Sequence, residues 1–135
     1  ARHADFVDHS GLGDGSRISP RAMVAALASA GWDGPLRELL KPVRFRDAQG
    51  RPMKDHAVTA VAKTGTLNFV SGLAGYAEAP GGRRMVFAIF CADMERRAGI
   101  PEEQRERPPG GRSWAARARI LQSRLIERWA ALHDL

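Results

Sequence analysis

Three runs of strand-forming residues follow one another in the middle of this chain, and a long amphipathic helix comes after them. The runs cover residues 58–62, 69–77 and 84–91, and the segment AEAPGG between the last two predicts an antiparallel hairpin. Residues 85–91 are apolar almost without alternation, which predicts a central strand that is covered on both faces and is the most buried element. Such a sheet needs a covering layer, so the pattern predicts an α+β fold with an antiparallel sheet packed against helices.

The C-terminal segment can supply that layer. A helix is predicted from Ser113 to about His133, with apolar residues at steps of three and four that form one narrow seam. We expect this seam to pack on the sheet; its members are Trp114, Ala118, Leu121, Leu125, Trp129 and Leu132.

Two shorter helices are predicted before the sheet. Ser19 is a good N-cap, Pro20 suits the first helical position and Gly31 is a stop signal, so a helix is expected between them. A second short helix is expected over residues 36–40 and is ended by Pro42. Loops or connectors are expected at residues 6–15, 44–55 and 95–112.

The single cysteine and the distribution of charge exclude several classes of function. Cys91 alone can form neither an internal disulfide nor a Cys-rich zinc site, and the scattered His3, His56 and His133 lack ligand spacing, so we predict no metal and no cofactor. The net charge is +6, but the arginines are not gathered in one tract, so we predict no nucleic-acid partner. No run approaches the ~18 apolar residues of a transmembrane helix, so no transmembrane segment is predicted.

The segment with the most chemical character is AKTGTLNFVSGLAG, which begins at Ala62. It places Lys63, Thr64 and Gly65 at the end of one predicted strand, with Thr66 next. An ammonium and a hydroxyl fixed on a sheet edge can hold a carboxylate by charge-assisted hydrogen bonds. A glycine beside them lets a peptide lie close against the strand.

The sequence around this segment carries a family resemblance. Lys-Thr-Gly is a motif of serine β-lactamases and penicillin-binding proteins. The stretches VDHSGLGDGSRISP, WDGPLRELL and KTGTLNFVSGLAGYAEAPGGRRMVFAIF occur here in the order found in class C penicillin-binding proteins. From about Phe6 to Phe90 the chain therefore resembles that family, which comprises D-alanyl-D-alanine carboxypeptidases and endopeptidases acting on peptidoglycan. The resemblance implies the C-terminal part of the penicillin-binding protein or serine β-lactamase-like transpeptidase fold.

The resemblance also implies roles for four residues. Lys63 and Thr64 would bind the terminal carboxylate of the substrate, Gly65 would leave room for the substrate peptide, and the backbone N–H of Thr66 would be one of two oxyanion-hole donors. It further implies peptidoglycan stem peptides as substrates, β-lactams as ligands of the full-length parent, and the bacterial periplasm or cell envelope as the location.

Two elements of the family are absent from the sequence. None of the seven serines has a lysine three residues later, and Ser-x-Asn is missing because Asn68, the only asparagine, follows Lys-Thr-Gly. We therefore expect residues 1–135 to be the C-terminal portion of a DD-peptidase domain whose nucleophilic serine lies elsewhere, and which is inactive alone. His9 and Gly13 are further departures, and they fall in a predicted structural turn.

Other interpretations remain beside this one. A non-catalytic module could use the same strand edge to bind cell-wall peptides or a partner protein, and the exposed edges of a fragment favour a homodimer. A hydrolytic pair of His9 and Ser10 is disfavoured because adjacent loop residues seldom face each other. A phosphate-binding loop at GLGDG is disfavoured because Asp8 and Asp14 would repel phosphate.

Overall fold

The centre of the molecule is a four-stranded antiparallel sheet in the order β3-β4-β5-β6. The computed structural model describes residues 4–11, 15–47, 49 and 51–132. The strands of the sheet are β3 (Lys41–Pro42), β4 (Thr59–Leu67), β5 (Val70–Glu78) and β6 (Arg84–Ala92). A separate two-stranded ribbon of β1 (Ala4–Asp5) and β2 (Arg17–Ile18) precedes them.

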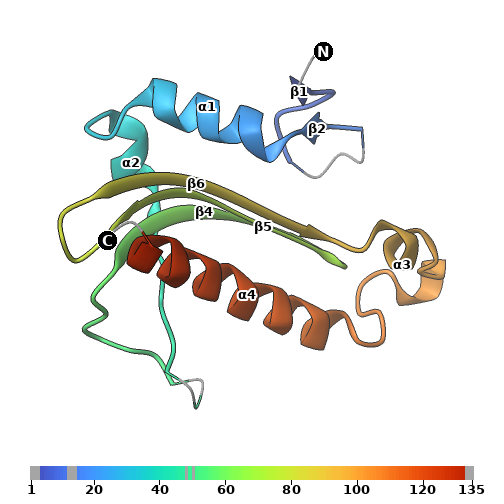
Figure 1. Ribbon diagram of the computed structural model, residues 1–135. Helices are drawn as coiled ribbons and strands as arrows, with labels where there is room; N and C mark the ends of the chain where they lie inside the picture. Colours follow the sequence, from blue (N-terminus) through green and yellow to red (C-terminus); the bar gives the residue numbers. More distant parts are fainter. Residues whose placement is uncertain (1–3, 12–14, 48, 50, 133–135) are drawn as a thin grey trace.

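Helices cover both faces of the sheet. Helix α1 (Pro20–Ala30) lies over one face and helix α4 (Gly111–Leu132) over the other (Figure 1). The short helices are α2 (Pro35–Leu39), α3 (Met94–Ala98) and a 3-10 turn at Glu102–Gln104. The α+β class with an antiparallel sheet packed against helices is therefore confirmed.

Helix α1 begins and ends where its sequence signals predict. The Ser19 side chain accepts a hydrogen bond from the backbone N–H of Ala22 at 3.1 Å, and Pro20 occupies the first turn. The backbone N–H of Gly31, with φ of 81°, closes the last turn on Leu27 and Ala28. The cap and the stop satisfy backbone groups that a helix end otherwise leaves unpaired.

The most buried strand is β5, so the expectation that residues 85–91 would be central and most buried is wrong. Strand β6 is the last strand of the sheet, and Phe87 and Ile89 are its only buried residues, whereas Leu73–Ala77 of β5 are all buried. Small side chains on β5 allow strands and helices to approach on both sides. Hydrophobicity alone underestimates such a strand, because glycine and alanine carry little apolar surface.

The buried face of helix α4 coincides only in part with the predicted seam. Ala118 is buried, and Leu125 and Trp129 pack against the core as expected. Leu121 and Leu132 are 51% and 52% exposed, while Ile126 is fully buried. The buried residues are Gly111, Ala118, Gln122, Ile126 and Ala130, which mostly recur every four residues. The apolar pattern missed Gln122, a polar residue that is buried because it has hydrogen-bond partners on β5.

The boundaries of the other elements also differ from the predictions. The strand expected at 58–62 continues to Leu67, the segment at 44–55 contains an isolated bridge between Arg46 and Pro52, and the connector at 95–112 carries α3 and the 3-10 turn. Two residues of the loop predicted at 44–55, Ala48 and Gly50, lie outside the described residues.

A buried amide ties α4 to the sheet. Gln122 Nε2 donates to the carbonyl oxygen of Ser71 at 3.0 Å and to its Oγ at 3.2 Å, and both residues are at most 3% exposed. We expect Gln122→Leu to lower the free energy of unfolding by about 2 kcal/mol, because the Ser71 groups lose their buried partner.

Urea unfolding measures this effect. The matched control is Gln104→Leu, since Gln104 is exposed and undergoes the same chemical change. Equal midpoints for the two variants would show that the Gln122 contacts do not stabilise the fold.

Candidate functional site

The Lys-Thr-Gly segment lies within β4, with one of its edges unpaired. Residues Lys63 to Thr66 pair with Ala74 to Ser71 of β5. On the other side, β3 pairs only with Val61 and Ala62. Within the part of the chain that the structure describes, the sheet edge beyond Ala62 therefore has no strand beside it. The motif was expected at the end of a strand, and it instead forms part of an open edge.

The direction of the backbone groups at this edge follows from one hydrogen bond. The Val43 N–H donates to the carbonyl oxygen of Ala60 at 2.8 Å, on the β3 side of β4. In an antiparallel strand, residues two apart direct their N–H and C=O groups to the same side. The backbone groups of Thr64 and Thr66 therefore point to the open edge, where an added strand could pair with them.

The side chains of the segment divide between the two faces of the sheet. Ala62 belongs to the core beneath α4, and Val61 packs against the core beneath α1. Because side chains alternate along a strand, Thr64 and Thr66 lie on the α4 face and Lys63 on the α1 face. One edge therefore offers hydroxyls on one side and an ammonium on the other.

Lys63 is accessible, as a carboxylate-binding residue must be. Its side chain is exposed, and Nζ donates to the carbonyl oxygen of Thr64 at 2.6 Å. The neighbours Thr64, Gly65 and Thr66 are also exposed. The ammonium is thus held against the open edge and retains two further N–H donors for a ligand.

Gly65 has no packing role in the described structure. A Cβ at this position would meet no atom within 4 Å, and its φ lies outside the positive region. The fold therefore does not require glycine here. A ligand lying close to the strand would require it.

A tight turn fixes the far end of β4. Phe69 has φ of 58° and is only 2% exposed, with its ring 6.1 Å from that of Trp114 on α4. Its carbonyl oxygen accepts from the N–H of Asp93 at 2.9 Å, and Arg97 donates to the carbonyl oxygen of Asn68 at 3.2 Å. These contacts hold the turn to α4 and to the start of α3, so the strand edge is rigidly supported.

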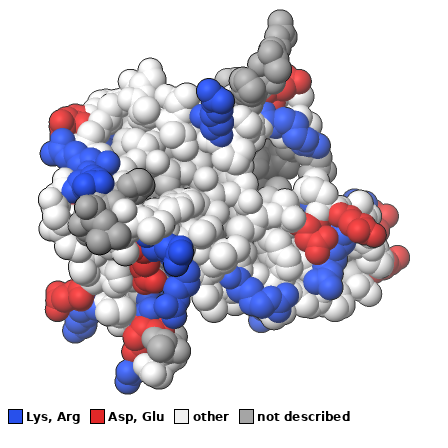
Figure 2. All heavy atoms as spheres, in the orientation of Figure 1, with Lys and Arg blue, Asp and Glu red and all other residues white. Residues whose placement is uncertain are grey.

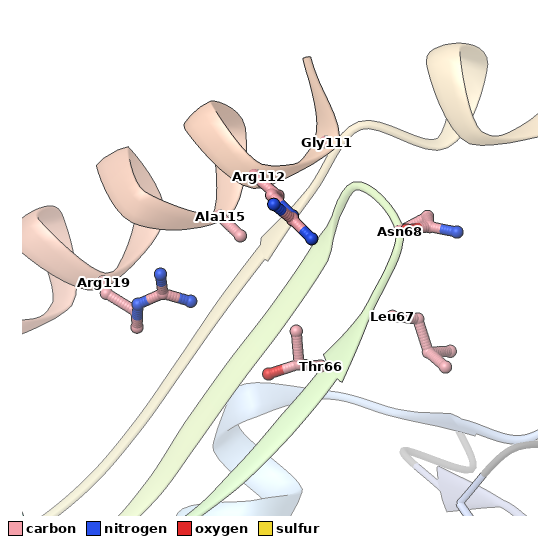
Figure 3. A pocket seen from close by; sticks show the side chains of 7 residues that line it. All are labelled: Thr66, Leu67, Asn68, Gly111, Arg112, Ala115 and Arg119. Atoms are coloured by element: carbon pink, nitrogen blue, oxygen red, sulfur yellow. The ribbon is translucent and has the colours of Figure 1, made fainter. Parts of the chain in front are cut away.

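An open groove of about 570 Å³ lies between this turn and the beginning of α4 (Figure 3). Figure 3 shows the Arg112 and Arg119 side chains extending from the helix toward the strands, and Thr66 on the strand that faces them. Leu67 and Asn68 line the strand side of the groove, and Gly111 and Ala115 line the helix side. The groove meets the candidate site at Thr66 and does not reach Lys63 in its described lining.

The sequence did not reveal the helix side of this groove. Arg112 was placed in a connector and Arg119 outside the predicted seam. The only signal is the spacing of 112, 115 and 119, which puts three side chains on one face of α4. Their proximity to Thr66, some fifty residues earlier, depends on how the helix crosses the sheet.

The rival pair in the N-terminal loop is not assembled. The Asp8 carboxylate accepts from the Ser10 N–H and Oγ at 2.8 and 2.9 Å, so Ser10 is bonded to Asp8 and forms the predicted turn. His9 is exposed beside it. Leu12, Gly13 and Asp14 lie outside the described residues.

The other singled-out residues have structural partners. Burial raises the pKa of the Cys91 thiol, which keeps it protonated and poorly nucleophilic at neutral pH. His56 stacks on Phe45 and lies 3.2 Å from a carboxylate oxygen of Glu127. Tyr76 is 1% exposed, and its hydroxyl donates to the carbonyl oxygen of Leu27 at 2.8 Å.

Charge is dispersed on the face of the molecule seen in Figure 2. Lys and Arg side chains alternate with Asp and Glu around its margin, and an uncharged area lies between them. This face therefore presents no single basic patch of the kind that binds a nucleic-acid backbone.

We call the four exposed residues Lys63–Thr66 on the open edge of β4 the ledge. A comparison with family models gives the class of protein to which the chain belongs. The model described as the D-Ala-D-Ala carboxypeptidase 3 (S13) family matches residues 2–107, more than half of the sequence. The chain belongs to this family. The match spans the ledge and ends before α4. No curated protein and no solved structure matches the sequence.

Family membership sets the general activity. The family consists of serine peptidases of the bacterial cell wall with D-Ala-D-Ala carboxypeptidase activity, which implies peptidoglycan peptides as substrates. Among the described residues, no helix is long and apolar enough to cross a membrane.

Proposed function

We propose that this chain is the C-terminal portion of a DD-peptidase domain and supplies the substrate clamp of a serine-type D-Ala-D-Ala carboxypeptidase or endopeptidase. Lys63 and Thr64 bind the terminal carboxylate of the stem peptide, and the Thr66 N–H forms half of the oxyanion hole. The observation that carries the proposal is the unpaired edge of β4, on which all four residues of the segment are exposed.

The chemistry assigned to this edge is recognition and charge stabilisation. A serine outside these residues attacks the carbonyl of the penultimate D-Ala, and the negative charge that develops on its oxygen is stabilised by the Thr66 N–H. The tetrahedral intermediate then collapses: the peptide C–N bond breaks, the terminal D-Ala leaves as a protonated amine, and the serine ester remains as the acyl-enzyme. Water hydrolyses this ester, which releases the shortened peptide and regenerates the serine. In this proposal the enzyme works in the periplasm, and β-lactams enter the same site of the full-length parent.

A titration with two matched peptides tests the clamp. Acetyl-Ala-D-Ala-D-Ala should shift the backbone N–H signals of Thr64 and Thr66 in nuclear magnetic resonance spectra, because both groups point to the open edge. The C-terminal amide of the same peptide lacks the carboxylate and should bind more weakly. Identical shifts from both peptides, or none from either, would refute a carboxylate clamp.

The chain alone should not react with penicillin. None of its seven serines has the Ser-x-x-Lys spacing that acylation needs in this family. We expect the intact mass to remain unchanged after incubation with a labelled penicillin. A covalent adduct on any serine would contradict the proposal.

A second candidate function is a non-catalytic module for cell-wall peptides or a partner protein. The observation that favours it is the same exposed edge of β4 in a sequence that lacks the Ser-x-x-Lys spacing of the family. Adding the upstream chain separates the two functions. Restored hydrolysis favours the enzyme, and persistent inactivity with retained peptide binding favours the module.

The open edge also favours a homodimer of this chain. The β4 edge beyond Ala62 has no described strand beside it, and an unpaired edge can pair with a second copy. Sedimentation at high concentration should therefore show a dimer. A monomer under these conditions would count against it.

A further inference from the structure

We infer that the groove beside Thr66 is a subsite for an acidic group on the acyl side of the scissile bond, bound by Arg112 and Arg119. This inference rests on the proposed function, because the clamp sets the direction in which a substrate lies. It adds a specificity determinant on α4, outside the segment that the family model matches.

The direction of the substrate follows from the two ends of the ledge. The terminal carboxylate is held at Lys63 and Thr64, and the scissile carbonyl is held at Thr66. A peptide paired with the open edge in this order runs antiparallel to β4. Its residues before the scissile bond therefore continue past Thr66 toward Leu67 and the turn, where the groove begins.

The charge of the groove selects an anion. Its described lining contains two guanidinium groups and no carboxylate. Arg112 and Arg119 are both exposed, and no ion pair is found for either among the described residues. Guanidinium groups bind carboxylates in a bidentate geometry, so a carboxylate of the substrate is the chemical group that fits.

The two arginines lie on one face of α4. Residues 112, 115 and 119 recur at steps of three and four on α4, and Ala115 between the arginines is small. Figure 3 shows both guanidinium groups on the side of the helix that faces the strands. The adjoining groove of about 490 Å³ shares Arg112 and contains Glu106 beside Arg107, so the acid-free lining is a property of the Thr66 groove.

The probes are acetyl-Glu-D-Ala-D-Ala and acetyl-Gln-D-Ala-D-Ala, which differ only in one charge on the third residue from the C-terminus. We expect the Glu peptide to bind about fivefold more tightly than the Gln peptide at low ionic strength, and the ratio to fall as salt is added. The double variant Arg112→Gln, Arg119→Gln should reduce the ratio to about one.

The control variant is Arg124→Gln, Arg128→Gln. It removes the same charge from the same helix, from positions outside the groove lining. This variant should keep the preference for the Glu peptide. If it loses the preference as fully as the groove variant does, the selectivity comes from overall charge and the subsite is refuted.

The outcomes distinguish the two proposals. Equal binding of the two peptides to the unaltered chain overturns the subsite and leaves the clamp intact. Failure of the Gln peptide to bind, with Arg-dependent binding of the Glu peptide, overturns the clamp and supports the groove as an anion site. Failure of both peptides to bind overturns both.

Discussion

Replacing Gly75 by alanine should strongly destabilise the protein. A Cβ on Gly75 would lie 2.1 Å from the Val61 carbonyl oxygen and 2.7 Å from the Ala62 Cα. Both are backbone atoms of the neighbouring strand, so relief requires β4 and β5 to separate. We expect a loss of about 3 kcal/mol, at the upper end of typical overpacking effects, and a clear fall in the urea midpoint.

Gly65→Ala is the matched control on the partner strand. Its Cβ would meet nothing within 4 Å, so stability should stay the same or rise by about 0.5 kcal/mol as the unfolded chain loses freedom. Binding of acetyl-Ala-D-Ala-D-Ala should nevertheless weaken, because the methyl group occupies space beside the ledge. A Gly75 variant as stable as the Gly65 variant would disprove the close approach of the strands.

The second large effect is expected at Lys63. Lys63→Met should weaken binding of acetyl-Ala-D-Ala-D-Ala by roughly tenfold to a hundredfold, the usual range for losing a hydrogen bond to a charged group. Unfolding should be unaffected, because the side chain is exposed and its hydrogen bond within the described residues goes to the carbonyl oxygen of the neighbouring Thr64. Calorimetric titration of both chains measures the ratio.

Two controls isolate the charge on Lys63. Lys54→Met makes the same change at another exposed lysine and should leave affinity unchanged. The C-terminal amide of the peptide should bind the Lys63 variant and the unaltered chain almost equally. An equal loss of affinity for the acid and the amide would mean that Lys63 does not bind the carboxylate.

Sequence signals predicted the elements whose causes are local. Helix α1 follows from Ser19, Pro20 and Gly31, and the β5–β6 hairpin follows from its glycine-rich turn. The most buried strand was harder to predict, because the burial of β5 depends on close packing of small side chains. Apolar strength pointed instead to β6, which lies at the end of the sheet.

The sequence predicted the β4 part of the candidate site but not the α4 part. Lys63 and its three neighbours form a contiguous motif, so the sequence alone indicated them. Their openness could not be predicted, because it depends on β3 ending its pairing at Ala62. Arg112 and Arg119 were missed for a related reason, since the contact between α4 and the turn joins residues far apart in the chain.

The composition of β5 restricts how this protein can vary. Its central residues lie between two helices and two strands, and Ala74, Gly75 and Ala77 leave little space for larger groups. Relatives with this architecture should therefore keep small residues along that strand, even where α1 and α4 differ widely. A bulky residue on β5 would push the neighbouring strands of the sheet apart and displace the ledge on β4. A position on β5 that contacts no ligand would therefore still affect peptide binding at the ledge.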